Sequence, residues 1–169
     1  MYTLKRQGRV TEQQIQEAAA LFDRKNLEYK YQTEVGGLTG GTGGGERYYM
    51  PLGILFHIAA GNAQGLPFYS VVEGLLTGNI NILKLPSGDD GLSVFLLQEL
   101  VRLKPNLSRH VIVIDAPSTN RKLMQSLGKL ADAIVVWGGD EAIREVREIF
   151  RQWGFYVMKK TAFIWKNSF

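Results

Sequence analysis

Residues 49–87 read YMPLGILFHIAAGNAQGLPFYSVVEGLLTGNINILKLPS. The apolar run Ile54–Ile58 predicts a buried strand, and Gln64–Thr77 predicts a helix that stops at Gly78, because glycine commonly follows the last turn of a helix. The run Ile80–Leu85 then predicts a second strand. A strand, a helix and a second strand in this order form a βαβ unit, which makes the two strands parallel.

The same alternation continues towards the C-terminus. Helices are predicted over Leu92–Leu103, Thr119–Leu130 and Glu141–Trp153, and strands over Val111–Ile114 and Ile134–Val136. Strands that alternate with helices of this length favour a parallel sheet with right-handed crossovers and helices on both faces. The predicted fold class is therefore α/β, with an open, mostly parallel, doubly wound sheet.

The N-terminal part predicts an arm that is separate from this sheet. Thr11 and Gln14 form a capping-box pattern ahead of an amphipathic helix over residues 11–24, and Leu27–Thr33 predicts a strand. A cluster of glycines follows within residues 36–45, but neither a Lys-Ser/Thr pair nor a helix start comes after it, which favours a linker over a phosphate-binding loop. The expected organisation is an arm over 1–35, a Gly-rich linker over 36–46 and an α/β domain over 47–169.

The composition excludes several classes of protein. Of the 169 residues, 45% are apolar and 21% are charged, and the net charge of +4 comes without a long run of like charges, so no nucleic-acid partner is expected. The first residues lack the apolar core of a signal peptide and no apolar segment is long enough to span a membrane, which favours a cytoplasmic location. The chain has no cysteine and two histidines, His57 and His110, so disulfides and a thiol nucleophile are excluded and no metal site is expected.

Several polar residues follow the predicted strands at their carboxyl ends. Ligands of open parallel α/β sheets bind beyond these ends, because helix N-termini and free backbone N–H groups converge there. The residues suited to a polyanionic nucleotide are Asn62 after the first strand, Lys84 and Ser87 after the second, and Gly138 and Gly139 before the last helix. Together they predict a nucleotide site at one edge of the sheet.

At these residues the chain resembles the aldehyde dehydrogenase superfamily, and more closely the fatty acyl-CoA (acyl-protein thioester) reductase family of bacterial bioluminescence. The resemblance covers about residues 48–150. The segments that carry it are Pro51-Leu-Gly53, His57-Ile-Ala-Ala-Gly-Asn62, Gly74-Leu-Leu-Thr-Gly-Asn-Ile-Asn-Ile-Leu-Lys84, Pro86-Ser87 and Trp137-Gly-Gly-Asp-Glu-Ala-Ile143. It implies a Rossmann-like, NAD(P)-binding domain of the aldehyde dehydrogenase type.

The resemblance also implies a role for each candidate residue. Asn62 matches an oxyanion-hole asparagine, which would stabilise negative charge on the substrate carbonyl oxygen. Lys84 matches the lysine that binds the adenine-side ribose, and Ser87 stands where NAD-preferring relatives often carry a glutamate, so NADP(H) is favoured over NAD(H). Gly138 and Gly139 match the turn that packs on the pyrophosphate. Two structural alternatives stay open: Asn62 as a helix cap and Lys84 as a solvated surface lysine.

For function, the resemblance implies NADPH-dependent reduction of a long-chain fatty acyl-CoA or acyl thioester to an aldehyde. In this family a cysteine thiolate in a later catalytic domain attacks the acyl group, and this chain contains no cysteine. We therefore expect a truncated cofactor-binding portion that is inactive alone and that forms a homo-oligomer or meets a partner chain carrying the catalytic half. The alternative is a non-catalytic nucleotide-binding or interaction module that serves a partner chain.

His57 is a further candidate, because histidine serves in acid–base catalysis. Its position inside the apolar run Ile54–Ile58 instead favours a core histidine whose hydrogen bonds are satisfied within the protein.

Overall fold

The computed structural model describes residues 12, 13, 16, 23–34, 50–59 and 65–151, together with the backbone of two strands at 155–157 and 162–166. The chain divides into two compact units. One unit comprises Arg9–Pro51, and the other contains all described residues from Leu52 onward.

Within the first unit, helix α2 spans Arg24–Glu34. The prediction of a strand over Leu27–Thr33 is therefore wrong. Apolar residues at alternate positions fit a strand, but most of the segment consists of residues with good helix propensity. The side chains of Arg24 and Glu28 form an ion pair one helical turn apart, with 2.7 Å between Nε and Oε1, which supports the helix.

Other predictions for the N-terminal arm fall largely outside the described residues. Of the helix predicted over residues 11–24, Glu12, Gln13 and Gln16 are described in its interior, and all three are helical. The capping box and the Gly-rich linker over 36–46 lie outside the described residues.

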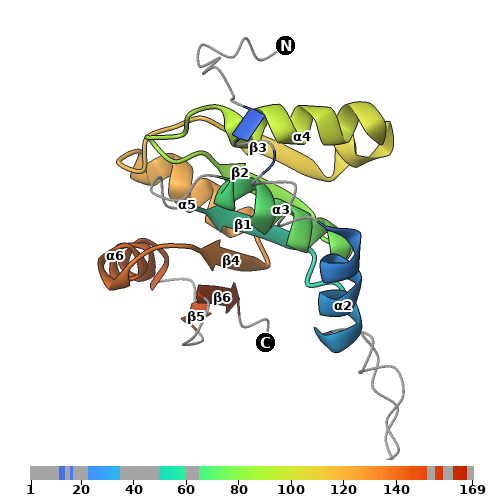
Figure 1. The fold of residues 1–169 in the computed structure, drawn as a ribbon. Helices are drawn as coiled ribbons and strands as arrows, with labels where there is room; N and C mark the ends of the chain where they lie inside the picture. Colours follow the sequence, from blue (N-terminus) through green and yellow to red (C-terminus); the bar gives the residue numbers. More distant parts are fainter. Residues whose placement is uncertain are drawn as a thin grey trace, which may run out of the picture. The chain divides into compact units, whose positions relative to one another are not determined.

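The second unit is built on a six-stranded sheet with the order β3-β2-β1-β4-β6-β5 (Figure 1). Its strands are β1 (Ile54–Ile58), β2 (Ile80–Lys84), β3 (Val111–Ile114), β4 (Ala133–Val136), β5 (Phe155–Val157) and β6 (Ala162–Lys166). The first four are parallel to one another, whereas β6 pairs antiparallel with both β4 and β5. The predicted open, mostly parallel α/β sheet is confirmed, and β5 and β6 were not predicted.

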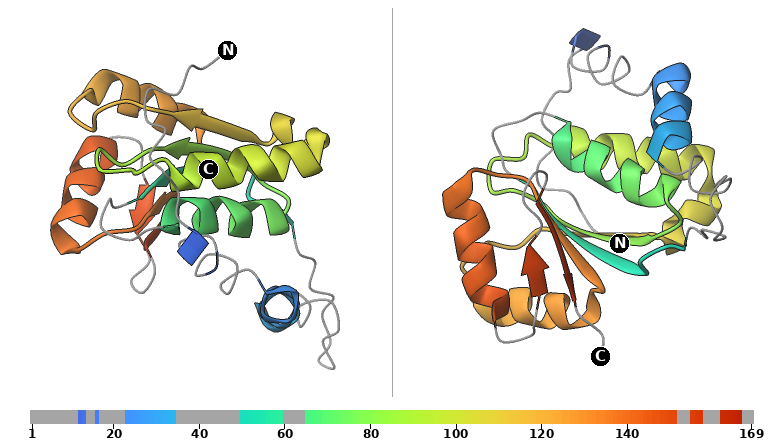
Figure 2. Two further views of the ribbon diagram at one scale, coloured as in Figure 1. Left: turned by 45° about the horizontal axis from the view of Figure 1, so that its top comes forward. Right: turned by 90° about the horizontal axis from the view of Figure 1, so that it is seen from below.

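Helices cover both faces of the parallel strands. They are α3 (Leu66–Leu76), α4 (Leu92–Leu103), α5 (Arg121–Leu130) and α6 (Asp140–Phe150), with a short 3₁₀ helix η2 (Pro105–Arg109) before β3. Helices α3 and α4 lie on one face, and α5 and α6 lie on the other (Figure 2). This division follows from right-handed crossovers, because the chain moves outward from β1 to β3 and then returns to β4.

An apolar core lies between the sheet and helices α5 and α6. Phe56 of β1 and Phe150 of α6 meet edge to face there, with their ring centroids 6.3 Å apart. Both rings are fully buried. The other buried members of this cluster are Ile82, Met124, Leu127, Ala131, Ile134, Val136 and Val146.

On the opposite face, Gly74 allows α3 to approach β2 closely. A Cβ atom at Gly74 would collide with Oδ1 of the fully buried Asn81. The Asn81 amide cannot move aside freely, because its Nδ2 donates to the Asn79 carbonyl at 2.9 Å. The helix therefore needs glycine here, although glycine is a poor helix former.

We expect Gly74→Ala to lower the free energy of unfolding by about 1–3 kcal/mol, since overpacking of a buried contact outweighs the gain in helix propensity of about 1 kcal/mol. Urea denaturation measures this change. As a control, the cost of Gly74→Ala should be clearly smaller in an Asn81→Ala background, where the colliding oxygen is gone. A neutral or stabilising Gly74→Ala would contradict the close approach of α3.

Candidate functional site

The order of strands reverses between β1 and β4. The chain passes from β1 to β2 to β3 in one direction and then places β4 on the other side of β1. Such a switch point opens a crevice at the carboxyl ends of the strands, where open α/β sheets bind ligands. Three strands end together here, because Ile58 is in register with Lys84 on β2 and with Val136 on β4.

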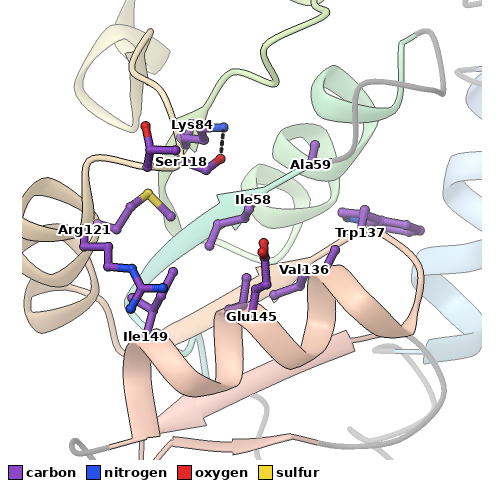
Figure 3. A pocket seen from close by; sticks show the side chains of 13 residues that line it. Ile58, Ala59, Lys84, Ser118, Arg121, Val136, Trp137, Glu145 and Ile149 are labelled. Atoms are coloured by element: carbon purple, nitrogen blue, oxygen red, sulfur yellow. Dashed lines mark hydrogen bonds between the residues drawn. The ribbon is translucent and has the colours of Figure 1, made fainter.

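A pocket of about 240 Å³ lies at this switch point (Figure 3). Apolar side chains line much of it, namely Ile58, Ala59, Met124, Val136, Ala142, Val146 and Ile149. The other lining residues are Lys84, Ser118, Thr119, Arg121, Trp137 and Glu145. Pockets for drug-sized ligands typically measure about 300–1,000 Å³, so this one can enclose part of a dinucleotide but not all of it.

Lys84 ends β2 and is 3% exposed, so the alternative of a solvated surface lysine is wrong. Its Nζ donates a hydrogen bond of 2.7 Å to the hydroxyl of Ser118, which belongs to the loop between β3 and α5 (Figure 3). Burial lowers the pKa of the Lys84 ammonium, and the nearby Asp115 carboxylate partly opposes this shift. An anion bound beside Nζ would likewise favour the charged form.

The other predicted site residues in the described part of the chain do not line the pocket. Ser87 is exposed in the turn after β2 and does not line the pocket. Gly138 and Gly139 are exposed in the turn between β4 and α6, and Gly139 is the N-cap residue of α6, where no side chain caps the helix. These three residues follow the carboxyl ends of β2 and β4. Asn62 lies outside the described residues, in the connection that leaves β1.

The structure adds polar pocket residues that the sequence interpretation missed. Ser118 and Arg121 come from the loop after β3 and the first turn of α5, and Glu145 reaches the pocket from α6 (Figure 3). The loop that holds Ser118 follows the carboxyl end of a predicted strand and so satisfies the rule that ligands bind there, and Arg121 lies just beyond it. Nothing in the sequence singled out Glu145 among the charged residues of its helix.

His57 lies beneath α3, not in the pocket. Its ring is 1% exposed, with Nδ1 2.6 Å from Ser70 Oγ and Nε2 2.9 Å from Asn81 Oδ1. Because Asn81 uses its Nδ2 to donate to Asn79, its Oδ1 is the acceptor, and Nε2 of His57 therefore carries the proton. Nδ1 then accepts from the Ser70 hydroxyl. The prediction of a core histidine with satisfied hydrogen bonds is confirmed.

Burial lowers the pKa of His57 from 6.5 to about 4, and the hydrogen bond with Asn81 opposes this shift. The folded protein therefore binds fewer protons than the unfolded chain between these two pH values. Its stability must fall as the pH drops from 6.5 towards 4.

We expect His57 to account for a loss of about 3 kcal/mol in the free energy of unfolding over this range, at about 1.4 kcal/mol per pKa unit. Urea denaturation at several pH values between 7 and 4 tests this. His57→Gln should flatten the pH dependence over this range. An unchanged slope in His57→Gln would contradict the buried neutral imidazole.

Two further findings concern metal-binding groups and membrane-spanning helices. Among the described residues, no group of three or more histidine and acidic side chains is arranged to hold a metal ion. None of the described helices combines the length and the apolar character that a membrane crossing requires.

The fold and the pocket define an open α/β domain with a candidate ligand site at the switch point of its sheet. The sequence model of the family described as acyl-CoA reductase (LuxC) matches residues 5–157, and the chain belongs to this family. The predicted family membership is thereby confirmed.

Two curated relatives are similar to part of the chain. It is 32% identical over 96 residues to the long-chain acyl-protein thioester reductase of Vibrio harveyi, and 29% identical over 97 residues to the protein of the same name from Aliivibrio fischeri. These matches cover 55% and 56% of this chain, and 20% of each relative. No solved structure matches the chain.

Proposed function

We propose that this chain supplies the dinucleotide-binding part of a reductase that converts a long-chain acyl thioester to an aldehyde with NADPH. Membership of the acyl-CoA reductase family supports acyl reduction and favours this proposal over a non-catalytic interaction module. The observation that carries the binding proposal is the buried Lys84, which lines a pocket of mixed apolar and polar side chains at the switch point.

The charges of the pocket support a particular orientation of the dinucleotide. Lys84 of β2 and Arg121 of α5 provide the positive charges of the pocket, Ser118 provides a hydroxyl from the loop between β3 and α5, and Glu145 of α6 provides a carboxylate. A phosphate group is attracted to the two cationic side chains and repelled by the carboxylate. We place the adenine-side ribose beside Lys84 and its 2′-phosphate beside Arg121. The neutral Ser87 adds no carboxylate that would repel this phosphate.

We place the pyrophosphate at the turn formed by Gly138 and Gly139. Backbone N–H groups at the start of a helix favour anions, and α6 has no side-chain cap that would occupy them. A Cβ at Gly139 would meet nothing within 4 Å among the described residues, which leaves room beside this backbone. The role of Asn62 in the oxyanion hole remains a proposal based on the sequence resemblance.

When bound, the dinucleotide supplies the hydride for reduction of the acyl carbon. The residues of this chain bind and orient the dinucleotide, but they offer no thiol for covalent capture of the acyl group. We propose that a thiol on a partner chain performs that step, because further copies of this cysteine-free sequence could not supply it. The cytoplasmic location also remains a prediction.

We expect Arg121→Ala to weaken NADPH binding about 10- to 100-fold and to change NADH binding little, because a hydrogen bond to a charged group contributes about 1.5–3 kcal/mol. Lys84→Met should weaken the binding of both dinucleotides, since the ribose is common to them. Calorimetric titration of each variant with NADPH and NADH measures these effects.

The control for Arg121→Ala is Lys122→Ala, which removes a neighbouring exposed positive charge that does not line the pocket. It should leave both affinities close to those of the wild type. Equal losses for NADPH and NADH in Arg121→Ala would refute the assignment of the 2′-phosphate, and a wild-type protein that binds neither dinucleotide would refute the proposed function.

We also expect the purified 169-residue chain to form no aldehyde from NADPH and a long-chain acyl-CoA. Loss of the nucleophile alone costs about 10⁶ in rate in a well-studied hydrolase. Aldehyde formation, followed by mass spectrometry and by NADPH absorbance, measures this, with a complete member of the family as the positive control. Turnover above background by this cysteine-free chain would show that the proposed division of labour is wrong.

A further inference from the structure

Trp137 connects the pocket to the buried polar residues beneath α3. It follows β4 directly and lines the pocket. Its indole Nε1 donates a hydrogen bond of 2.8 Å to Oγ of Ser70, and the same oxygen lies 2.6 Å from Nδ1 of His57. Ser70 and His57 are 2% and 1% exposed, so this connection is shielded from water.

The hydrogen bonds run in one direction. The indole N–H of Trp137 donates to Ser70, the Ser70 hydroxyl donates to His57, and Nε2–H of His57 donates to Asn81. Each acceptor is the correct partner for its donor in the tautomer deduced above. Removing one member leaves a buried polar group without its partner, which lowers stability.

Trp137 also links these hydrogen bonds to the turn that follows β4. Its backbone N–H donates to the carbonyl of Ile58 at 3.0 Å, so both its backbone and its ring are held. Gly138 and Gly139 come next and begin the turn into α6. Because glycine tolerates many backbone conformations, the fixed residue before this pair restricts where the turn can lie.

We propose that Ser70 and His57 are positioning residues, which hold Trp137 in place beside the pocket and thereby direct the Gly138–Gly139 turn. Neither residue touches the pocket itself, and both act through Trp137. The effect on dinucleotide affinity rests on the proposed function, whereas the effect on the orientation of Trp137 does not.

The first test uses Ser70→Ala in the ligand-free protein. The indole N–H signal of Trp137, assigned with Trp137→Phe, should shift and exchange faster with solvent, and the amide signals of Gly138 and Gly139 should move. The matched control is Ser93→Ala, because Ser93 is 1% exposed and its hydroxyl has no hydrogen-bond partner among the described residues. It should leave all these signals unchanged.

The second test measures NADPH affinity. Ser70→Ala should weaken binding about three- to tenfold, as expected for the loss of one buried hydrogen bond, and Ser93→Ala should not. Trp137→Phe removes the same hydrogen bond from its other end. The double variant that combines Ser70→Ala with Trp137→Phe should therefore bind NADPH no more weakly than the single variant that has the lower affinity.

Each outcome is decisive for one part of the proposal. An unchanged Trp137 indole signal in Ser70→Ala would overturn the positioning role, and so would additive losses of affinity in the double variant. If Ser70→Ala does not fold, the signals of Gly138 and Gly139 in Trp137→Phe provide the same test, and unchanged signals there overturn the proposal. Failure of the wild type to bind NADPH, with the expected NMR changes present, would refute the proposed function but leave the positioning role supported.

Discussion

The pairing of β1 with β2 on one side and with β4 on the other is the constraint on which the rest of the structure depends. It brings Ile58, Lys84 and Val136 to the same level, although they are far apart in the sequence. One crossover leads from β1 to β2 and another returns from β3 to β4 on the other side of β1, and the crevice opens at this reversal. A different position for β4 would separate the apolar wall of the pocket from its buried lysine.

The strand period of two residues then divides the polar side chains between the two faces of the sheet. Lys84 shares its face with Ile82 and meets the pocket beside α5, whereas Asn81 points to α3 and meets His57. A shift of one residue in register would exchange these two sets. One face consequently carries the charged side chains that line the pocket, and the other carries the hydrogen-bonded residues His57, Ser70 and Asn81. Trp137 connects the two at the carboxyl edge.

Much of the fold could be predicted because the four parallel strands and their helices carry strong local patterns. Strand Val111–Ile114 is continuously apolar, and Leu92–Leu103 is bounded by clear breaks, so both agree with the structure to the residue. The segment from Leu27 to Thr33 could not be decided by alternation alone, since helix propensity and a pair one turn apart determined its structure. Strands β5 and β6 are short, and their aromatic and β-branched residues were the one signal that could have indicated them.

By itself, the sequence determined the α/β class, the family and the edge of the sheet at which Lys84, Gly138 and Gly139 lie, because these properties follow from local periodicity and from motifs along the chain. The tertiary structure alone decided that Lys84 is buried against Ser118 and that Ser70 joins His57 to Trp137. Those contacts link residues from different strands, helices and loops. Their geometry depends on how whole elements pack, which no local pattern encodes.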